Sequence, residues 1–361
     1  MNFPPRANLT KGEINRIGER IRTHIQGEPG YEQAIKTLNE WRIGHHYPMH
    51  TFNMTLRRKA HGVDKNAIVA RRLKRRDTII DKVTHRQPDM RLSAMQDIAG
   101  VRAIVKDVKH VQKLLEIYTE PGRFPHTLKN VKNYIEEPKD SGYRGVHVVF
   151  EFRNSQGRSE HARDYDGLLV EMQLRTGLQH RWATAVEAIG LVRHEELKSS
   201  HGDESWLEFF QLMASVIAQI EDTPVLALHK DMADHEIIDR AYQLIKELDV
   251  YNAITGWAVG MNAVTDVDTG HGAGQHYVIL QVDVKNRRTR LHRFTEKSLT
   301  EANALLEKLE VEAQADGAPS PVLVSVGDIK NLERAYPNYF LDIRQFLELV
   351  SHVVKTVEDA V

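Results

Sequence analysis

The sequence contains no cysteine, which excludes disulfides, thiolate metal sites and a cysteine nucleophile. It has no apolar run approaching about 18 residues, and residues 1–10 lack a basic-then-apolar pattern, so we expect neither a membrane span nor an export signal. An excess of charge is also missing, because 49 Lys and Arg face 50 Asp and Glu, a net charge of -1. Any nucleic-acid site must therefore be local, and the cytoplasm is the default location.

Spacing of apolar residues predicts a helical first part followed by a mixed α/β sheet. The chain of 361 residues, 41% of them apolar, is long enough for about two domains. A long basic helix is expected from Asp64 to about Lys82. The other predicted helices are residues 10–26, 31–43, 48–60, 108–119, 176–192, 205–220 and 231–248. The predicted strands are residues 100–107, 146–152 and 168–174.

The last third repeats an α+β pattern on a smaller scale after a linker around Pro224. Its predicted elements are a hairpin of residues 276–284 and 289–294, a helix at 299–315, a strand at 321–326, and helices at 328–335 and 339–357. We expect a smaller C-terminal α+β domain there.

Positive charge is concentrated in residues 55–86, where eleven Lys or Arg stand against three Asp, a balance of 11 − 3 = +8. One interpretation is a solvated basic helix face. The alternative is a phosphate site, because Arg72, Lys74 and Lys82 combine point charges with a planar guanidinium and Thr78 lies at helical spacing from the two lysines.

Two carboxylates stand at predicted strand boundaries on an apolar background. Asp97 precedes one strand and Glu171 lies inside another. Each could pair with a nearby arginine, Arg102 or Arg175. If they converge from adjacent strands, they suit Mg²⁺, which is commonly held by one or two carboxylates and substrate phosphates.

A glycine-flanked loop, residues 138–147, lies between these carboxylates and enters a strand. Tyr143, with Lys139 and His147 close in sequence, is expected to be held out on a flexible loop as a stacking platform for a base. The alternative is an ordinary turn with an exposed aromatic residue.

Taken in order, these segments resemble the synthetase domain of the RelA/SpoT family over roughly residues 40–195. The matching motifs are Arg72-x-Lys74, Thr78 and Lys82, then Asp97-Ile98-Ala99-Gly100-Val101-Arg102, Lys139 to His147, Val170 to Thr176, and Gln179 to Glu187. The resemblance implies a nucleotidyltransferase-like mixed sheet flanked by helices, in an α/β (α+β) fold with a smaller C-terminal α+β regulatory domain. The expected division is 1–60 for N-terminal helices, 61–195 for the pyrophosphokinase domain, 196–250 for connecting helices, and 251–361 for an antitoxin-like domain of the pseudo-zinc-finger kind.

The activity implied by the resemblance is transfer of the β,γ-pyrophosphate of ATP to a ribose 3′-hydroxyl. The residues expected to bind ATP are Arg72, Lys74, Thr78, Lys82 and Arg102. Asp97 and Glu171 would hold Mg²⁺, with Glu171 accepting the hydroxyl proton, and Tyr143 and His147 complete the expected catalytic set. The acceptor would be bound by Lys139, Tyr143, His147, Gln173 and Arg175. Thr78, Arg75-Arg76 and Gly145 depart from the usual pattern and leave the identity of the acceptor open.

The tail carries Tyr336-Pro337-Asn338-Tyr339, which alone is most often a packed helix junction. In this context it resembles fused toxin–antitoxin proteins of the CapRel type. That resemblance implies that Tyr336 and Tyr339 obstruct the adenine site, that a phage capsid protein or another phage protein releases the block, and that the acceptor is the 3′-CCA end of tRNA. The residues expected to bind tRNA are Arg57, Arg58, Lys59, Arg75 and Arg76. The alternatives are a (p)ppGpp synthetase acting on GDP or GTP with a regulatory C-terminal domain, and a non-catalytic nucleotide- or RNA-binding module.

Overall fold

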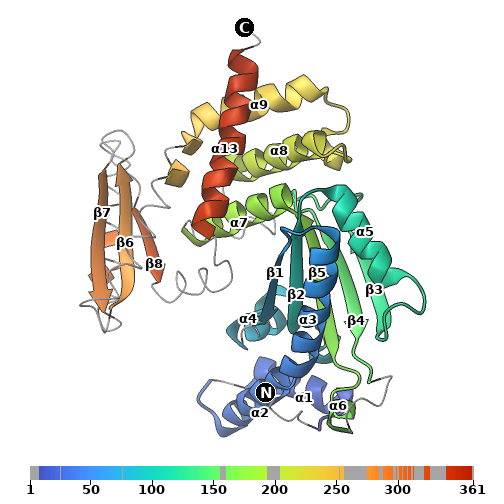
Figure 1. Cartoon of the computed structure of the whole chain (residues 1–361). Helices are drawn as coiled ribbons and strands as arrows, with labels where there is room; N and C mark the ends of the chain where they lie inside the picture. The colour runs from blue at the N-terminus through green and yellow to red at the C-terminus, as the bar shows by residue number, and fades with distance from the viewer. Residues whose placement is uncertain are drawn as a thin grey trace. The chain divides into compact units, whose positions relative to one another are not determined.

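The computed structural model divides the chain into two units (Figure 1). The first unit is Met1–Tyr134 with Gly145–Gly177, and the second is Ile135–Arg144 with Leu178–Val361. The residues that the structure describes are 8–24, 26–74, 76–154, 160–192, 204–251, 253–255, 275–283, 288–295, 298, 301–302, 304–306, 308–309, 312, 321–325 and 339–359.

The first unit is built around a five-stranded mixed sheet, as predicted. Its strand order is β1-β2-β5-β4-β3, in which β2 and β5 are parallel and the other neighbours are antiparallel. The strands are β1 (Ile68–Leu73), β2 (Ala99–Val105), β3 (Thr127–Asn133), β4 (Val146–Glu151) and β5 (Leu169–Thr176). The helices are α1 (Lys11–Thr23), α2 (Pro29–Ile43), α3 (His46–Val63), α4 (Arg76–Asp81), α5 (Val108–Thr119) and the short α6 (Glu160–Arg163). The α/β class and the elements at 10–60 and 100–119 are thereby confirmed.

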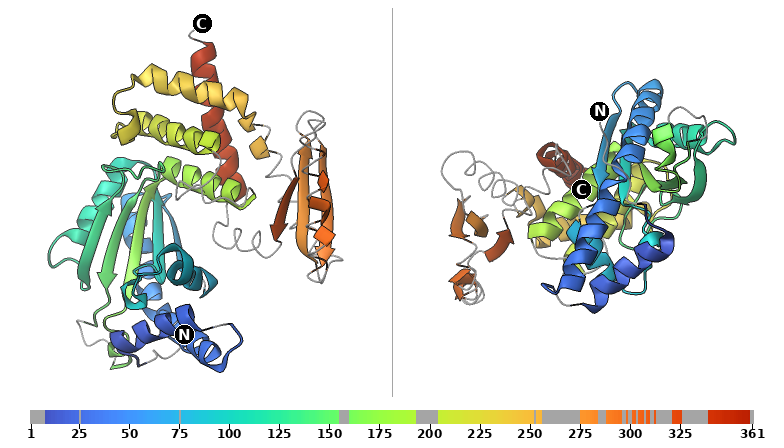
Figure 2. Two further views of the ribbon diagram at one scale, coloured as in Figure 1. Left: turned by 180° about the vertical axis from the view of Figure 1, so that it is seen from behind. Right: turned by 90° about the horizontal axis from the view of Figure 1, so that it is seen from below.

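Alternation along the strands gives the sheet one apolar and one polar face. The apolar face includes Val101, Met172 and Phe150, all nearly inaccessible to solvent. Helix α3 packs on this face against β1 and β2, and α5 packs against β5. In the view from behind, the strands lie in front of α3 (Figure 2).

The predicted basic helix from Asp64 to Lys82 is wrong. Residues 68–73 form β1, which pairs antiparallel with β2, and only Arg76–Asp81 is α-helical, followed by a π-helical turn at Lys82–Arg86. Asp64 accepts a hydrogen bond from the backbone of Asn66 at 2.9 Å and therefore closes a turn. Lys and Arg occur both in helices and in solvated edge strands, so their pattern does not distinguish the two. Residues 68–73 are a strand because they pair with β2.

Helices α1 and α2 pack on the segment between β1 and β2. The shared apolar core is Ile14, Ile17, Ile21, Ala34, Leu38, Trp41, Ile79, Val83, Leu92, Met95 and Ile98. Because Val83 and Ile98 are fully buried there, their neighbours Lys82 and Asp97 are held at fixed positions.

The second unit contains helices and a small separate sheet. Its helices are α7 (Gly177–Val192), α8 (Glu204–Ile220), α9 (Asp234–Glu247) and α13 (Tyr339–Glu358), and its three strands, in the order β7-β6-β8, are β6 (Gln275–Asp283), β7 (Arg288–Thr295) and β8 (Pro321–Ser325). The predicted hairpin is confirmed by the antiparallel β6–β7 pair. The predicted helix at 328–335 lies outside the described residues, and that at 299–315 is helical in the parts that are described.

Helix α13 packs against the helices that precede the small sheet in sequence. Phe346 contacts Phe209 and Phe210 of α8 with ring centroids 6.3 and 6.0 Å apart, and His180 Nε2 of α7 lies 3.3 Å from Asp342 Oδ2. The expected division of the chain between residues 250 and 251 would put α13 in a different domain from α7 and α8. In the structure, α13 packs against these two helices.

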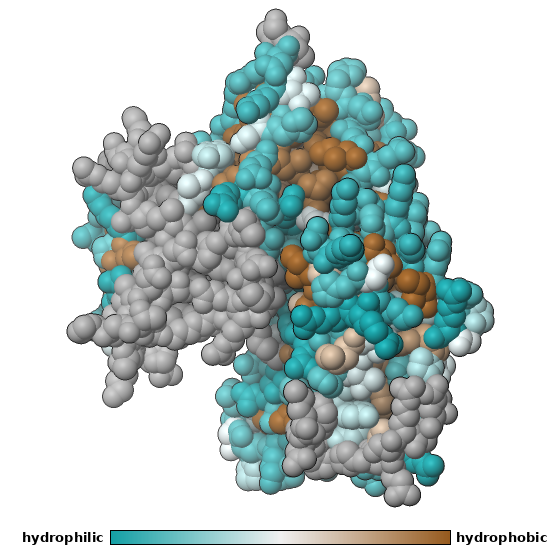
Figure 3. All heavy atoms as spheres, viewed as in Figure 1, coloured by the Kyte–Doolittle hydropathy of each residue, from teal (hydrophilic) through white to brown (hydrophobic). Residues whose placement is uncertain are grey.

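Hydrophilic side chains cover most of the described surface in Figure 3, with smaller hydrophobic areas between them. Within the part of the chain that the structure describes, no helix has the length and apolar character needed to cross a membrane.

Candidate active site

The polar face of the first unit's sheet brings together residues from four strands. Register pairs Arg72 with Gly100 and Gly100 with Glu171, and it pairs Arg102 with Gln173 and Gln173 with His147. Residues paired across neighbouring strands share a face. The side chains on this face are Arg72 of β1, Arg102 of β2, His147 of β4, and Glu171 and Gln173 of β5.

Glu171 is held by two neighbours on this face. His147 Nδ1 lies 2.9 Å from Oε1 of Glu171, and the Gln173 amide donates to Oε2 at 2.7 Å. Burial raises the pKa of this carboxyl and so does the charge of Asp97, but the hydrogen bonds and the charge of His147 prevail and leave the pKa below its usual value. Glu171 is therefore an ionised carboxylate in a largely buried site.

Gln173 links the carboxylate to two arginines. Its Oε1 accepts from Arg102 Nε at 3.3 Å and from Arg175 Nη2 at 3.3 Å. Arg175 is 3% exposed and lies against Gly145, where an added Cβ would stand 3.0 Å from Arg175 Cγ. Gly145 also has φ +141°, so the departure from the family pattern at this position is explained by a close approach that a side chain would obstruct.

Asp97 forms a second charged group with two lysines. Its Oδ2 accepts from Lys74 Nζ at 2.5 Å, and its Oδ1 lies 3.5 Å from Lys82 Nζ. The Lys74 backbone donates to the Ile98 carbonyl at 2.8 Å, which continues the β1–β2 pairing up to Asp97. Burial raises the pKa of Asp97, but the two ammonium groups prevail and lower it, while burial lowers the pKa of Lys74.

The donor set fits a magnesium ion shared with phosphates better than a closed protein site. Among the residues that the structure describes, no three His, Asp or Glu side chains gather as metal ligands. Asp97 and Glu171 lie close enough for the Asp97 charge to raise the pKa of Glu171. Asp97 precedes β2 and Glu171 lies in β5, the parallel neighbour of β2. Mg²⁺ is typically held by one or two carboxylates plus substrate phosphates and water.

The loop with Tyr143 belongs to the second unit, where the Tyr143 side chain is buried. Tyr143 is 7% exposed, and Lys139 Nζ lies 5.0 Å from its ring centre. The Gly142 amide donates to the Lys139 carbonyl at 2.8 Å, and the Lys139 amide donates to the Tyr143 carbonyl at 3.3 Å. The expectation of a tyrosine held out on a flexible loop is therefore wrong for this conformation, because the loop closes on itself.

Arg144 is a residue whose role the sequence reasoning missed. Its guanidinium donates to the Ile135 carbonyl at 3.2 Å, before the loop, and to the Pro224 carbonyl at 2.5 Å, after α8, and so ties the loop to both segments. Burial lowers its pKa to about 10. The only sequence signal is its place beside Tyr143. Its partners are backbone carbonyls, which every residue has, and Pro224 also lies far away in sequence.

The remaining predicted residues fall in several places. Thr78 is half-buried in α4, Arg76 is exposed at the start of α4, and Arg57, Arg58 and Lys59 are exposed near the end of α3. Arg75 and Tyr336 lie outside the described residues; Tyr339 begins α13, and its side chain is outside the description too.

The expected basic segment is split between α3 and the β1–α4 region. Arg71 Nη1 near the end of β1 lies 2.7 Å from His50 Nδ1, in the first half of α3. Arg57 is two turns further along that helix, at about 1.5 Å per residue roughly 10 Å beyond His50. The +8 of residues 55–86 therefore comes from two elements of the fold and not from one basic helix.

In comparison with known protein families, residues 71–192 match the model of the region found in RelA/SpoT proteins. The chain is 32% identical over 119 residues to GTP pyrophosphokinase YjbM of Bacillus subtilis, covering 32% of this chain and 52% of that protein. It is 25% identical over 166 residues to GTP pyrophosphokinase YwaC of the same organism, covering 45% of this chain and 72% of that protein. The chain thus spans about half the length of the first relative.

Among solved structures, small alarmone synthetase 1 from Bacillus subtilis bound to its product pppGpp has a TM-score of 0.44 and 21% identity, covering 52% of this chain and 94% of that one. Small alarmone synthetase 2 from the same organism has a TM-score of 0.41 and 18% identity, covering 51% and 94%. The RelA/SpoT resemblance of the central region is confirmed by the sequence match over residues 71–192.

Proposed function

We propose that the RelA/SpoT-type region makes this protein an ATP-dependent pyrophosphokinase. The observation that carries the proposal is the charged face on which Glu171 lies beside His147 and Gln173, with Asp97 between Lys74 and Lys82. Phosphoryl-type transfer needs positioning and charge neutralisation rather than a covalent nucleophile, and these side chains supply both. The names of the two Bacillus subtilis relatives support the same reaction class.

In the proposed reaction, the 3′-oxygen of the acceptor forms a bond to the β-phosphorus of ATP while the bond between that phosphorus and the α,β-bridging oxygen breaks. AMP leaves with the bridging oxygen, and the hydroxyl proton passes to Glu171. Lys74, Lys82 and Arg72 would neutralise phosphate charge. Mg²⁺ held by Asp97 and Glu171 would supply further positive charge when bound.

We propose the 3′-CCA end of tRNA as the acceptor, with translation blocked as the result. Exposed Arg76, at the start of α4, and Arg57, on α3, support an extended polyanion, because positive charge on two separate elements can contact more than one phosphate. GDP or GTP is the second candidate, and the names of both relatives favour it.

The acceptor is identified by incubating the full chain with γ-³²P-labelled ATP and either tRNA or GDP and GTP. Label in tRNA, lost after removal of the 3′-terminal adenosine, supports the first acceptor. Label in guanosine nucleotides alone would reject tRNA in favour of the second acceptor. No label in either, from the wild-type chain and from the Tyr336→Ala with Tyr339→Ala variant alike, would reject the pyrophosphokinase. Glu171→Gln, which removes the charge but keeps the shape, should transfer none.

We further propose that the tail restrains this activity, in a toxin–antitoxin fusion that acts in the cytoplasm and is released by a phage protein such as the capsid protein. The Tyr336-Pro337-Asn338-Tyr339 motif, directly at the start of α13, supports this proposal. Tyr336→Ala with Tyr339→Ala should make the protein toxic without phage infection, whereas the double Phe variant should stay closer to wild type. Unchanged growth at equal expression of the Ala variant would reject restraint by this motif.

A further inference from the structure

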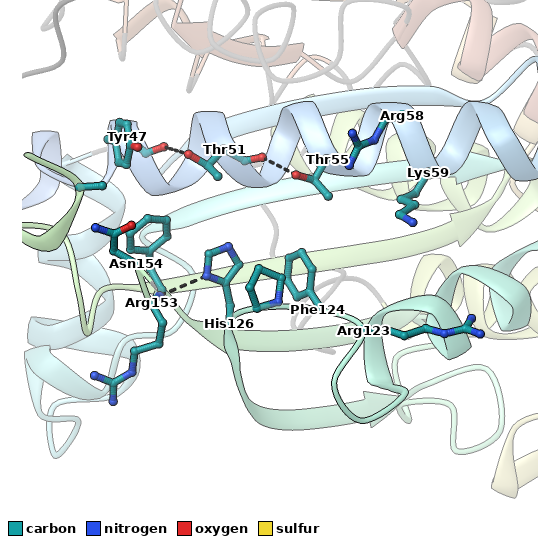
Figure 4. Close-up of a pocket in the computed structure, with 13 residues that line it drawn as sticks. Tyr47, Thr51, Thr55, Arg58, Lys59, Arg123, Phe124, His126, Arg153 and Asn154 are labelled. Carbon is teal, nitrogen blue, oxygen red and sulfur yellow. Dashed lines mark hydrogen bonds between the residues drawn. The ribbon is translucent and has the colours of Figure 1, made fainter. Parts of the chain in front are cut away.

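A cavity of about 290 Å³ lies in the first unit on the side of the sheet that α3 covers. Its walls come from α3, from the turn before β3 and from the segment that follows β4 (Figure 4). Phe52 of α3 lies here against Phe150 of β4, on the apolar face of the sheet. Glu171 is on the opposite face, so this cavity is separate from the candidate active site.

The charged side chains that line this cavity are all positive. The cationic lining residues are Arg58, Lys59, Arg123 and Arg153, and no Asp or Glu lines it. Arg123 is paired with Glu120 at 2.9 Å, and Arg153 is paired with Glu151. Arg58 and Lys59 have no acidic partner among the described residues, so two positive charges are left for a ligand.

His126 adds a neutral hydrogen-bond donor to the cavity wall. Its Nδ1 accepts from the Arg153 backbone amide at 3.1 Å, which leaves the ring proton on Nε2. Burial is the main reason that its pKa falls to about 4, so the ring is uncharged at neutral pH. Figure 4 shows the second ring nitrogen turned towards α3, and no acceptor for it occurs within the described residues.

The ring of His126 cannot readily move. It stacks on Phe52 with centroids 4.6 Å apart and on Phe152 with centroids 4.9 Å apart. Its Nε2–H is therefore a donor in a fixed position, and such a donor is well suited to an anion.

Two threonines on α3 present acceptors to the same cavity. Thr51 Oγ1 donates to the Tyr47 carbonyl at 3.1 Å, and Thr55 Oγ1 donates to the Thr51 carbonyl at 3.0 Å (Figure 4). Since each hydroxyl proton is already used, the oxygens can only accept. Hydroxyl or amino groups of a ligand would suit them, and a bare phosphate would not.

We propose that this cavity binds the 5′-phosphorylated nucleotide unit of a ligand, with the phosphate at Arg58, Lys59 and His126 and sugar hydroxyls at Thr51 and Thr55. A phosphate dianion matches the two unpartnered cations. The volume is just below the range of about 300–1,000 Å³ for small-molecule sites, which limits the ligand to about one nucleotide. The unit can come from a free mononucleotide or from the 5′-phosphate end of an RNA. The proposal does not depend on the pyrophosphokinase reaction.

The His126 ring signal, observed by NMR in full-length protein with labelled histidine and assigned with His126→Gln, reports on this cavity directly. The probes are AMP, a 5′-phosphorylated RNA trinucleotide and the same trinucleotide with a 5′-hydroxyl. We expect a saturable shift with a 5′-phosphate probe and at least a tenfold weaker response to the 5′-hydroxyl RNA. A response to AMP alone identifies a free nucleotide, and one to the phosphorylated RNA alone identifies an RNA end.

The matched variants are Arg58→Ala with Lys59→Ala against Lys109→Ala with Lys113→Ala, two exposed lysines of α5 that do not line the cavity. The shift should be lost in the first and kept in the second, with the melting temperature confirming that both fold. Because His126 does not touch the active site, AMP bound at the active site should not shift the His126 signal. Absence of any shift at millimolar probe, or a shift that survives the double substitution, would overturn the proposal.

Discussion

The imidazole Nδ1 of His147 lies 2.9 Å from Oε1 of Glu171, on the same face of the sheet and one strand away. Without this neighbour, burial and the charge of Asp97 would both raise the pKa of Glu171. The histidine therefore keeps ionised the carboxylate that is proposed to take the acceptor's proton.

His147→Phe should move the acid limb of pyrophosphate transfer to higher pH. In the wild type the pKa of Glu171 is lowered, so the enzyme loses activity only as pH falls below the ordinary glutamate pKa of about 4.3. In His147→Phe the pKa of Glu171 is raised, so the loss of activity begins above that value. The measurement is the pH profile of kcat/KM. His110→Phe removes another carboxylate-bonded histidine, at Asp107, and should leave the limb in place. An unmoved limb in His147→Phe would contradict this account of Glu171.

Asp97→Asn should lower the free energy of unfolding by about 3 kcal/mol, because it leaves Lys74, only 6% exposed, without its counter-charge. Lys74→Met combined with Asp97→Asn should recover part of the loss. Since the folded pKa of Asp97 lies below its unfolded value, its contribution is complete above about pH 4 and is lost as pH falls through the folded pKa. Urea unfolding at several pH values measures both effects, and equal stability of the single and double variants would argue against a buried pair.

Gly142→Ala should displace the Tyr143 loop. An added Cβ would stand 2.9 Å from Ala214 Cβ and 2.9 Å from Trp182 Cζ2, at φ +91°. Gly122→Ala is the matched control, because Gly122 also has positive φ, +79°, but nothing lies within 4 Å of the added atom. Overpacking should therefore destabilise the first variant by about 1–3 kcal/mol more than the second. Equal unfolding free energies would show that the loop yields to the added atom.

Arg144→Ala should expose the backbone of the same loop while leaving the fold intact. The carbonyls of Ile135 and Pro224 lose a buried donor, at a cost of about 1–3 kcal/mol. Hydrogen exchange at the Lys139 and Gly142 amides, which bond within the loop, should become faster. Arg240→Ala removes a surface arginine bound to Glu208 and should leave these amides protected. Unchanged exchange in Arg144→Ala would mean that other contacts hold the loop.

Element types were largely predictable from local patterns. The first predicted helix is present, and Thr10 caps it by accepting from the Glu13 amide at 3.2 Å. Strands β2, β4 and β5 follow their alternating apolar residues. Strands β1 and β3 were missed because both are edge strands with many exposed charged side chains, and such sequences carry little periodic signal.

The chemistry-bearing residues could be selected from the sequence because carboxylates and cations on an apolar background are costly unless they have partners. Lys74, Asp97 and Glu171 were identified in this way and by their motif order. Which groups pair cannot be predicted from the sequence. It offers Arg102 as a partner for Asp97 and Arg175 as a partner for Glu171, but the structure pairs Asp97 with Lys74 and Glu171 with His147.

The sequence by itself determined which side chains carry charge and which strands have a polar face. Only the tertiary structure decided that β2 and β5 are parallel neighbours, that Arg57 and Arg72 belong to different regions, and that Arg58 and Lys59 line a cavity behind the sheet. Alternation along a strand is a local property, whereas the choice of neighbouring strand depends on contacts between residues far apart in the chain, such as Gly100 with Glu171.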